Sequence, residues 1–476
     1  MCMSDTYASK EKAQGEEMGA MAKVGVALAD WSERWFPDAY VFAAIAVVLV
    51  AVIALFLGRT PMEVANDFGK SFWSLVPFTM QMAFVIITGY VVAVSKPIKK
   101  VLLMLAGVPK TPRFAIAYVG LVAMLSSLIC WGFSLVLAAF LSREISKRVK
   151  GVDYRAIGAA GYLGLCSIWA LGLSSSAALM MATKSSIPPA LYKISGTIGL
   201  DQTLFNWQNL VMILVLMGAS FWIAYASAPT AEHAKTAEMA GLVYKDEEEE
   251  VEPKASTPGE YLEYSPILTI FMALLGFGYL YTTFSTKGGL SALDLNNYTF
   301  MLLIVGMLFH WTPHNFLKAC GKAIPMSAGV FIQFPLYAGI FGMLMGSGLN
   351  EILANFFVSI STKETLPVTV GIYSALAGLL LPSGGGKWVV EAPYVLEAAN
   401  QLKCNLAWIV QVYNAAEALP NFINPFWMLP LLGVAGMKAR DLAGFAMLQF
   451  FFHVPLVLLL LYFLGLTHPY IPPIMQ

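Results

Sequence analysis

Twelve apolar runs, separated by short segments rich in proline, glycine and basic residues, cover most of this 476-residue sequence. Charged residues make up only 12% of the chain. Soluble proteins usually carry about 25%. One soluble core could not bury so much apolar surface, so we expect the excess to face lipid. The runs are Ala39–Leu57, Leu75–Val94, Phe114–Leu141, Ala156–Ala182, Gln208–Ala226, Ser265–Phe284, Tyr298–His310, Ala323–Met345, Leu366–Leu381, Trp388–Ala399, Leu406–Gly436 and Gly444–Leu464.

These runs predict an all-α polytopic membrane protein and exclude a soluble enzyme or a disordered scaffold. The alternation of polar and apolar residues that marks a membrane β-barrel is absent. The formal net charge is zero, so no basic surface is expected to attract nucleic acid.

Composition also divides the chain into four parts. Residues 1–38 are polar and predict a cytoplasmic N-terminal segment, and residues 39–226 form a first transmembrane half. Residues 227–264 contain an acidic run and predict a solvated cytoplasmic linker. Residues 265–476 form a second transmembrane half.

The two halves repeat one another at an offset of 252 residues. Hydropathy agrees without a gap over about 65 residues, and internal repeats are common in transporters. The matched pairs are Gly69-Lys70 with Gly321-Lys322, Gln81 with Gln333, Ser95 with Ser347, Leu128 with Leu380, and Gly132 with Gly384.

Basic residues set the expected orientation. Clusters of lysine and arginine flank Phe114–Leu141 on both sides, and a single crossing would place one cluster outside. This run is 28 residues, long for one span of about 20. A re-entrant hairpin, bent near Cys130–Ser134, satisfies both facts. The matching run Leu366–Ala399 has its own break at Pro382–Gly386. We therefore predict two inverted-topology repeats, each with a re-entrant hairpin and a broken helix, as in secondary transporters.

Four breaks within apolar runs form the candidate site. Irregular backbone survives in a membrane only where protein or a water-filled cavity satisfies its polar groups. Helix N-termini at such breaks favour a small anion. The breaks are Trp131–Ser134, Gly172–Ser176, Pro382–Lys387 and Asn421–Pro425. The substrate-binding candidates are Ser174, Ser175, Ser176, Ser383, Gly384, Gly385, Gly386, Lys387, Asn421 and Asn424, with Gln81 and Gln333 as equivalent polar positions inside helices.

Lys387 and Glu391 lie four residues apart, on one helical face. Charges inside a membrane are costly and are usually functional or paired. Either the two side chains pair with one another, or Lys387 faces a carboxylate substrate while Glu391 tunes it or carries a proton. Glu391 and Glu417 are the candidates for coupling transport to H+ or Na+.

The sequence contains no pattern that indicates catalysis. We find no zinc spacing, nucleophile elbow or nucleotide fingerprint, and we read the five cysteines as free thiols. We therefore expect no enzyme activity, no metal site and no cofactor.

Six motifs resemble the bacterial short-chain fatty acid transporter family. They are Trp35-Phe36-Pro37-Asp38, Pro77–Met82 with Met80-Gln81-Met82, Trp131-Gly132-Phe133, Phe331–Ile340, Pro382–Gly386 followed by Trp388, and Pro425-Phe426-Trp427. The resemblance implies a secondary transporter in the bacterial plasma membrane for monocarboxylates such as butyrate or acetoacetate. It also implies anion binding between hairpin tips and assembly as a homodimer. A transporter for dicarboxylates or another small organic anion is the alternative.

Overall fold

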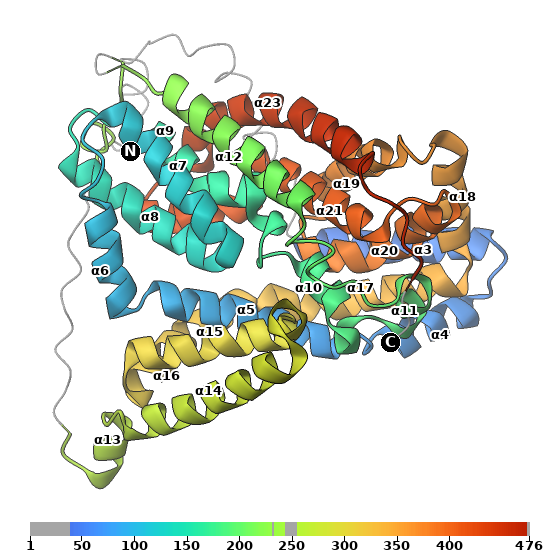
Figure 1. The fold of residues 1–476 in the computed structure, drawn as a ribbon, viewed down its shortest axis with the longest axis horizontal. Coiled ribbons are helices and arrows are strands. Elements are labelled where there is room, and N and C mark those ends of the chain that lie inside the picture. The colour runs from blue at the N-terminus through green and yellow to red at the C-terminus, as the bar shows by residue number, and fades with distance from the viewer. Residues whose placement is uncertain (1–38, 231–232, 243–254, 474–476) are drawn as a thin grey trace, which may run out of the picture.

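The computed structural model describes residues 39–230, 233–242 and 255–473, and every regular element in these ranges is a helix (Figure 1). The predicted N-terminal segment 1–38, the Trp35–Asp38 motif and the acidic run at 246–252 lie outside the described residues.

The first half has ten α-helices among its described residues. A short π-helix, η1 (Gly164–Ile168), and a 3-10 turn, η2 (Trp169–Leu171), interrupt the sequence between two of them. The helices are α3 (Ala39–Phe56), α4 (Pro61–Ser71), α5 (Val76–Ala93), α6 (Lys96–Leu105), α7 (Pro112–Ile129), α8 (Trp131–Arg148), α9 (Tyr154–Leu163), α10 (Ser176–Ala182), α11 (Pro189–Ser195) and α12 (Trp207–Ala226).

The described residues from 255 onward form eleven further α-helices, the first of which, α13, lies in the predicted linker. Four 3-10 turns lie between them: η4 (Gly289–Ala292), η5 (Ile324–Ser327), η6 (Leu419–Phe422) and η7 (Pro425–Met428). The helices are α13 (Pro258–Glu263), α14 (Ile267–Lys287), α15 (Leu295–His310), α16 (Pro313–Ala323), α17 (Ala328–Gly346), α18 (Leu349–Ile360), α19 (Leu366–Leu380), α20 (Gly384–Gln401), α21 (Leu406–Ala418), α22 (Leu429–Ala435) and α23 (Ala439–Gly465).

The helix boundaries repeat at the offset found in the sequence. Adding 252 to the bounds of α4 gives 313–323, the bounds of α16, and the same shift matches α5 to α17 and α8 to α20 within one residue at each end. The residues that begin these matched helices repeat as well. Thr60 and Thr312 both cap a helix that begins with proline, and each hydroxyl accepts a backbone N–H three residues on.

The matched helices run in opposite directions. In Figure 1 the chain passes from α4 on the right through α5 to α6 on the left. It passes from α16 on the left through α17 to α18 on the right. The two central helices, α5 and α17, pack against one another.

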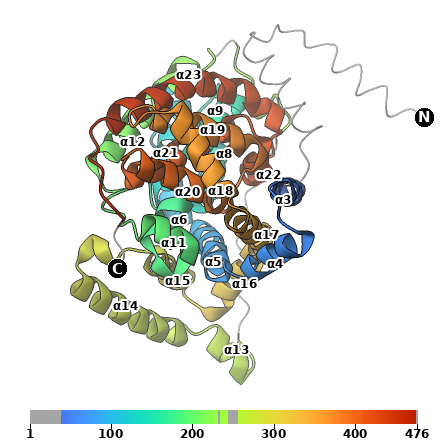
Figure 2. The ribbon, with the colours of Figure 1, turned by 90° about the vertical axis from the view of Figure 1, so that its right-hand side faces the viewer.

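Burial separates a central group of helices from a peripheral group. Every residue of α21 and most residues of α20 are buried, and so are residues 156–163 of α9. On α12, α14 and α23 the exposed side chains are largely apolar. Helix α14 lies at the edge of the molecule in both views, packed on α15 (Figure 2). Within the described ranges, seven helical segments are long and apolar enough to cross a membrane. The outer helices therefore suit contact with lipid.

The first hairpin bends at one residue rather than over a loop. Helix α7 ends at Ile129, Cys130 is extended with φ −154°, and α8 begins at Trp131. The expectation that Trp131–Ser134 is irregular was wrong, because these four residues form the first turn of α8. The second hairpin, α19 and α20, has its break at residues 381–383, beside the proline. The rest of the predicted break, Gly384–Lys387, forms the first turn of α20.

The described part of the linker packs against the helical body. The buried carboxylate of Asp153 accepts the Lys235 backbone N–H at 3.0 Å, and the Tyr154 N–H donates to the Lys235 carbonyl at 2.9 Å. Ala234 and Ala237 are buried. Asp153 and Tyr154 thus anchor residues 233–242 to the helical body, while residues 238–241 remain exposed.

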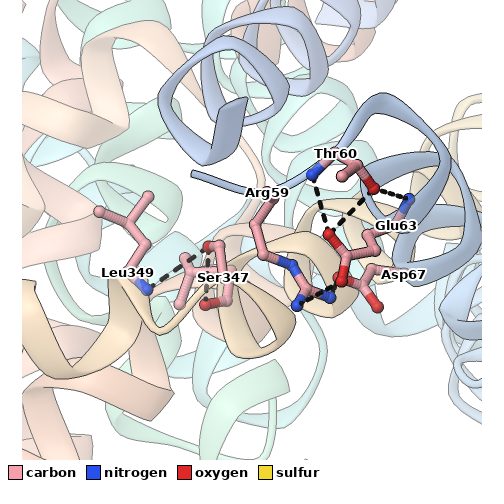
Figure 3. Close-up of polar contacts among 7 residues, drawn as sticks. Arg59, Thr60, Glu63, Asp67, Ser347 and Leu349 are labelled. Atoms are coloured by element: carbon pink, nitrogen blue, oxygen red, sulfur yellow. Dashed lines mark hydrogen bonds and ion pairs between the residues drawn. The ribbon is translucent and has the colours of Figure 1, made fainter. Parts of the chain in front are cut away.

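A polar corner joins α3 and α4 to the end of α17 (Figure 3). Arg59 forms ion pairs with Glu63 at 3.2 Å and with Asp67 at 2.9 Å. A Cβ atom built on Gly346 would overlap the Asp67 carboxylate, so only glycine allows this approach. The same holds one turn earlier, where Gly342 faces the Asp67 carbonyl and Ser71.

We expect Gly342→Ala to lower the melting temperature of the purified protein in detergent, because the added methyl must push α4 off α17. Overpacking of this kind costs about 1–3 kcal/mol. Gly329→Ala on the same helix is the matched control, since its nearest neighbour would be Gln333 Nε2 at 3.5 Å. Equal melting of the two variants would contradict the close approach.

Candidate functional site

The four chain breaks lie beside one another, and contacts between distant parts of the chain join them. The Leu173 N–H donates to the Leu128 carbonyl at 2.7 Å, which joins the break before α10 to the end of α7. The indole N–H of Trp427 donates to the Pro382 carbonyl at 3.0 Å, which joins the break before α22 to the second hairpin tip. Trp427 also packs edge-on against Trp131 at 5.3 Å between ring centroids, which adds the first hairpin tip.

The three serines before α10 have different roles. Ser174 donates its hydroxyl to the Ser127 carbonyl. Ser175 caps α10 by accepting the Ala178 N–H at 3.0 Å, and it donates to Asn414 Oδ1 at 2.9 Å. Ser176 lies opposite the second hairpin tip, since a Cβ built on Gly385 would be 3.2 Å from the Ser176 Cβ. The first two hydroxyls thus hold the break in place, while Ser176 borders the glycine tip.

The tip of the second hairpin is a capped helix N-terminus. Ser383 accepts the Gly386 N–H at 3.3 Å, and Gly384, Gly385 and Gly386 form the first turn of α20. The first N–H groups of any helix have no partner within that helix. This turn therefore presents backbone donors and the positive end of an 18-residue helix dipole.

Aromatic side chains cover the glycine tip, which sequence reasoning missed. Trp169 lies 2.6 Å from a Cβ built on Gly384, and Phe78 lies 3.0 Å from one built on Gly385. Tyr337 would overlap one built on Gly386. Phe78 and Tyr337 lie in motifs that the sequence analysis singled out, but no local pattern places them against α20.

The two asparagines of the fourth break are both buried. Asn421 donates to the Leu165 carbonyl of η1 at 3.0 Å. A π-helix leaves its carbonyls with altered partners, and the Asn421 amide supplies one of them. Asn421 therefore connects the two broken helices.

The structure does not place Gln81 and Gln333 together with the four breaks. Gln81 donates to Asn296 Oδ1 at 2.6 Å and accepts the Ser186 hydroxyl at 2.8 Å, so it joins α5 to α15 and to the segment after α10. Gln333 is half-buried on α17. Gln81 thus has the helix-to-helix hydrogen bonds that are common for amides in membranes.

A cluster of three buried ionisable side chains lies directly behind the tip. Lys387 Nζ is 2.5 Å from Glu417 Oε2 and 3.8 Å from Glu391 Oε2. It also donates to the Ser374 carbonyl at 2.6 Å, and its ammonium lies 4.7 Å from the centroid of the Tyr413 ring. Each of the three charged residues is at most 2% exposed.

Lys387 is therefore paired in this structure, and its nearer partner is Glu417 rather than Glu391. The spacing of four residues indicates only the pair within α20. Glu417 lies on α21, at a position where only the packing of the two helices could reveal it as a partner. Ser374 of α19 donates its hydroxyl to Glu391 Oε1, which joins a third helix to the cluster.

Two solved structures have this fold over most of the chain. The Alcanivorax borkumensis YdaH transporter, described as having an unusual topology, covers 92% of this chain and 100% of its own, with a TM-score of 0.58 and 14% identity. Neisseria gonorrhoeae MtrF, described within a class of antimetabolite efflux pumps, covers 95% and 100%, with a TM-score of 0.51 and 11% identity. At these identities the likeness defines the fold alone, which is a polytopic helical membrane fold.

Sequence comparisons narrow this class. The family model for short chain fatty acid transporters matches residues 20–464. A protein of Escherichia coli (strain K12) is 35% identical over 420 residues, 88% of this chain and 94% of the relative. One from Haemophilus influenzae is 32% identical over 450 residues, 93% of this chain and 100% of the relative. Both relatives are named as short-chain fatty acid transporters, and both names mark this function as assigned and not demonstrated. The chain belongs to the short chain fatty acid transporter family.

A double-mutant cycle tests the buried ion pair. We expect Lys387→Met to destabilise the protein by about 3–5 kcal/mol, because it leaves Glu417 buried without its cation. Glu417→Gln should destabilise it by less, because Glu391 remains beside Lys387. The double variant should recover most of that loss. The matched control is the ion pair of Lys147 and Glu144, which lie 3.0 Å apart and are more exposed. Single variants of this pair should lower the free energy of unfolding by less than about 1 kcal/mol. Additive losses at Lys387 and Glu417, measured by thermal unfolding in detergent, would contradict the pairing.

Proposed function

We propose that this protein is a secondary active transporter that moves short-chain monocarboxylates, such as butyrate and acetoacetate, across the bacterial plasma membrane. The observation that carries this proposal is the family match over residues 20–464, together with a glycine tip that packs against aromatic side chains. An H+ or Na+ gradient would drive uptake.

The substrate carboxylate would bind at the N-terminus of α20. The first-turn N–H groups of Gly384–Gly386 and the hydroxyls of Ser383 and Ser176 border this position. The alkyl tail would contact the rings of Trp169, Phe78 and Tyr337, since apolar surface gains free energy when it leaves water. Rigid hairpin motion around such a site would give alternating access.

The alternative is a transporter for dicarboxylates or another small organic anion. A second substrate carboxylate would need a second buried cation. Among the residues that the structure describes, Lys387 is the only buried lysine or arginine, and two carboxylates already flank it. A monocarboxylate is therefore favoured.

The proposal includes inverted topology of the two halves in the membrane. The opposite directions of α5 and α17 support it, and so does the excess of basic residues in the segments predicted to be cytoplasmic. Assembly as a homodimer rests on the family resemblance alone.

Counterflow in proteoliposomes tests the substrate class. Vesicles loaded with unlabelled butyrate should accumulate external labelled butyrate transiently, and acetoacetate should compete while succinate should not. Empty liposomes correct for the passive permeation of butyric acid. Counterflow no faster than in empty liposomes would reject short-chain fatty acids, and stronger competition by succinate would favour the dicarboxylate alternative.

A further inference from the structure

The Lys387, Glu391 and Glu417 cluster has more acid than base. The three side chains come from α20 and α21, and each is at most 2% exposed. If all three were ionised, the cluster would carry one net negative charge inside the protein. An uncompensated buried charge is strongly unfavourable, so the cluster favours taking up one positive charge.

The geometry distinguishes the two carboxyl groups. Glu417 lies 2.5 Å from the Lys387 ammonium, which neutralises it. Glu391 Oε2 lies 3.8 Å from the same ammonium and has no hydrogen-bond partner among the described residues. Its other oxygen accepts the Ser374 hydroxyl. Lys387 compensates Glu417 more closely than Glu391, so Glu391 is the carboxyl group that favours a proton.

In the part of the chain that the structure describes, the groups that face Glu391 from neighbouring helices supply no cation other than Lys387. Around the cluster lie four phenols, which are neutral at physiological pH. Tyr373 and Tyr394 flank Glu391 and pair through their hydroxyls at 2.8 Å. Tyr413 and Tyr337 face Glu417 from α21 and α17. Besides these phenols, only Lys387, Glu417 and Ser374 bear on the charge of Glu391.

The cluster is directly connected to the proposed carboxylate position. Lys387 follows Gly386 in the chain, and the Tyr413 hydroxyl donates to the Gly384 carbonyl at 2.5 Å while its ring lies beside the Lys387 ammonium. An anion at the tip would therefore experience the charge of the cluster. With Glu391 ionised, a substrate carboxylate would add a second uncompensated negative charge to a buried region.

We propose that Glu391 carries the proton that accompanies each carboxylate through the transporter, while Lys387 and Glu417 remain a fixed ion pair. This inference rests on the proposed function. One proton binds Glu391 from the side of entry and one carboxylate binds at the tip. Both leave on the other side, and the empty transporter returns. One proton and one monovalent anion move together, so the cycle transfers no net charge.

The lack of net charge transfer provides the test. Passive permeation of butyric acid is also electroneutral and produces no current. In proteoliposomes on a capacitive electrode, a jump of butyrate should evoke no current from the wild-type protein above that of empty liposomes. Glu391→Gln retains a neutral side chain of the same shape, so it should carry butyrate without a proton. We expect it to give a current of inward negative charge and to lose the response of uptake to a pH gradient.

Two further variants control for misfolding and for effects that do not depend on Glu391. Glu391→Met is a second neutral replacement of similar size and should behave like Glu391→Gln. Glu351→Gln changes an exposed carboxylate of α18 and should remain electroneutral like the wild type. Both Glu391 variants should retain butyrate counterflow, because exchange needs no net proton movement.

Several outcomes would overturn the assignment. A wild-type current, a requirement for sodium, or electroneutral transport by both Glu391 variants would each reject Glu391 as the proton carrier. Loss of counterflow in both variants would reject it as well. Absence of butyrate counterflow in the wild type is a different result, since it would reject the proposed function itself.

Discussion

A helix that breaks within a membrane leaves backbone N–H and carbonyl groups without partners, and lipid cannot supply them. The breaks in the described part of this chain obtain partners from segments far away in the sequence. Trp427 donates to Pro382, Leu173 to Leu128, and Asn421 to Leu165. The breaks can therefore exist only when they are together. The central position of α9, α20 and α21 follows from this requirement, because only a fully buried helix can bring its irregular ends to such partners.

Close approach between helices depends on glycine at a few positions. Gly342 and Gly346 allow α4 to lie directly on α17, and the glycines of the second hairpin tip allow aromatic rings to reach the backbone of α20. Without a hydrophobic force between helices in lipid, such packing and interhelical hydrogen bonds supply much of the association. The glycine tip combines both properties, since it packs closely and leaves backbone donors at the start of a helix.

Much of the architecture could be predicted because its signals are local or repeat along the chain. Apolar runs predicted membrane helices, the offset of 252 residues matched helix boundaries almost residue for residue, and Pro382 marked the second hairpin break. The error at Trp131–Ser134 has a physical cause. A single extended residue, Cys130, is enough to reverse direction, so the residues after it resume a helix immediately. The contact of the linker with Asp153 was not predicted, because it depends on a residue far away in the sequence.

The sequence by itself determined the class, the family, the duplication and the approximate positions of the breaks, because these depend on composition, periodicity and motifs within short windows. It also identified Lys387 and Glu391 as buried charges that share one helical face. Only the tertiary structure decided that Glu417 is the nearer partner of Lys387, that Ser374 bonds Glu391, and that Trp169, Phe78 and Tyr337 surround the glycine tip. These residues lie on separate helices, and the distance between side chains on separate helices depends on how the helices pack, which no local pattern encodes.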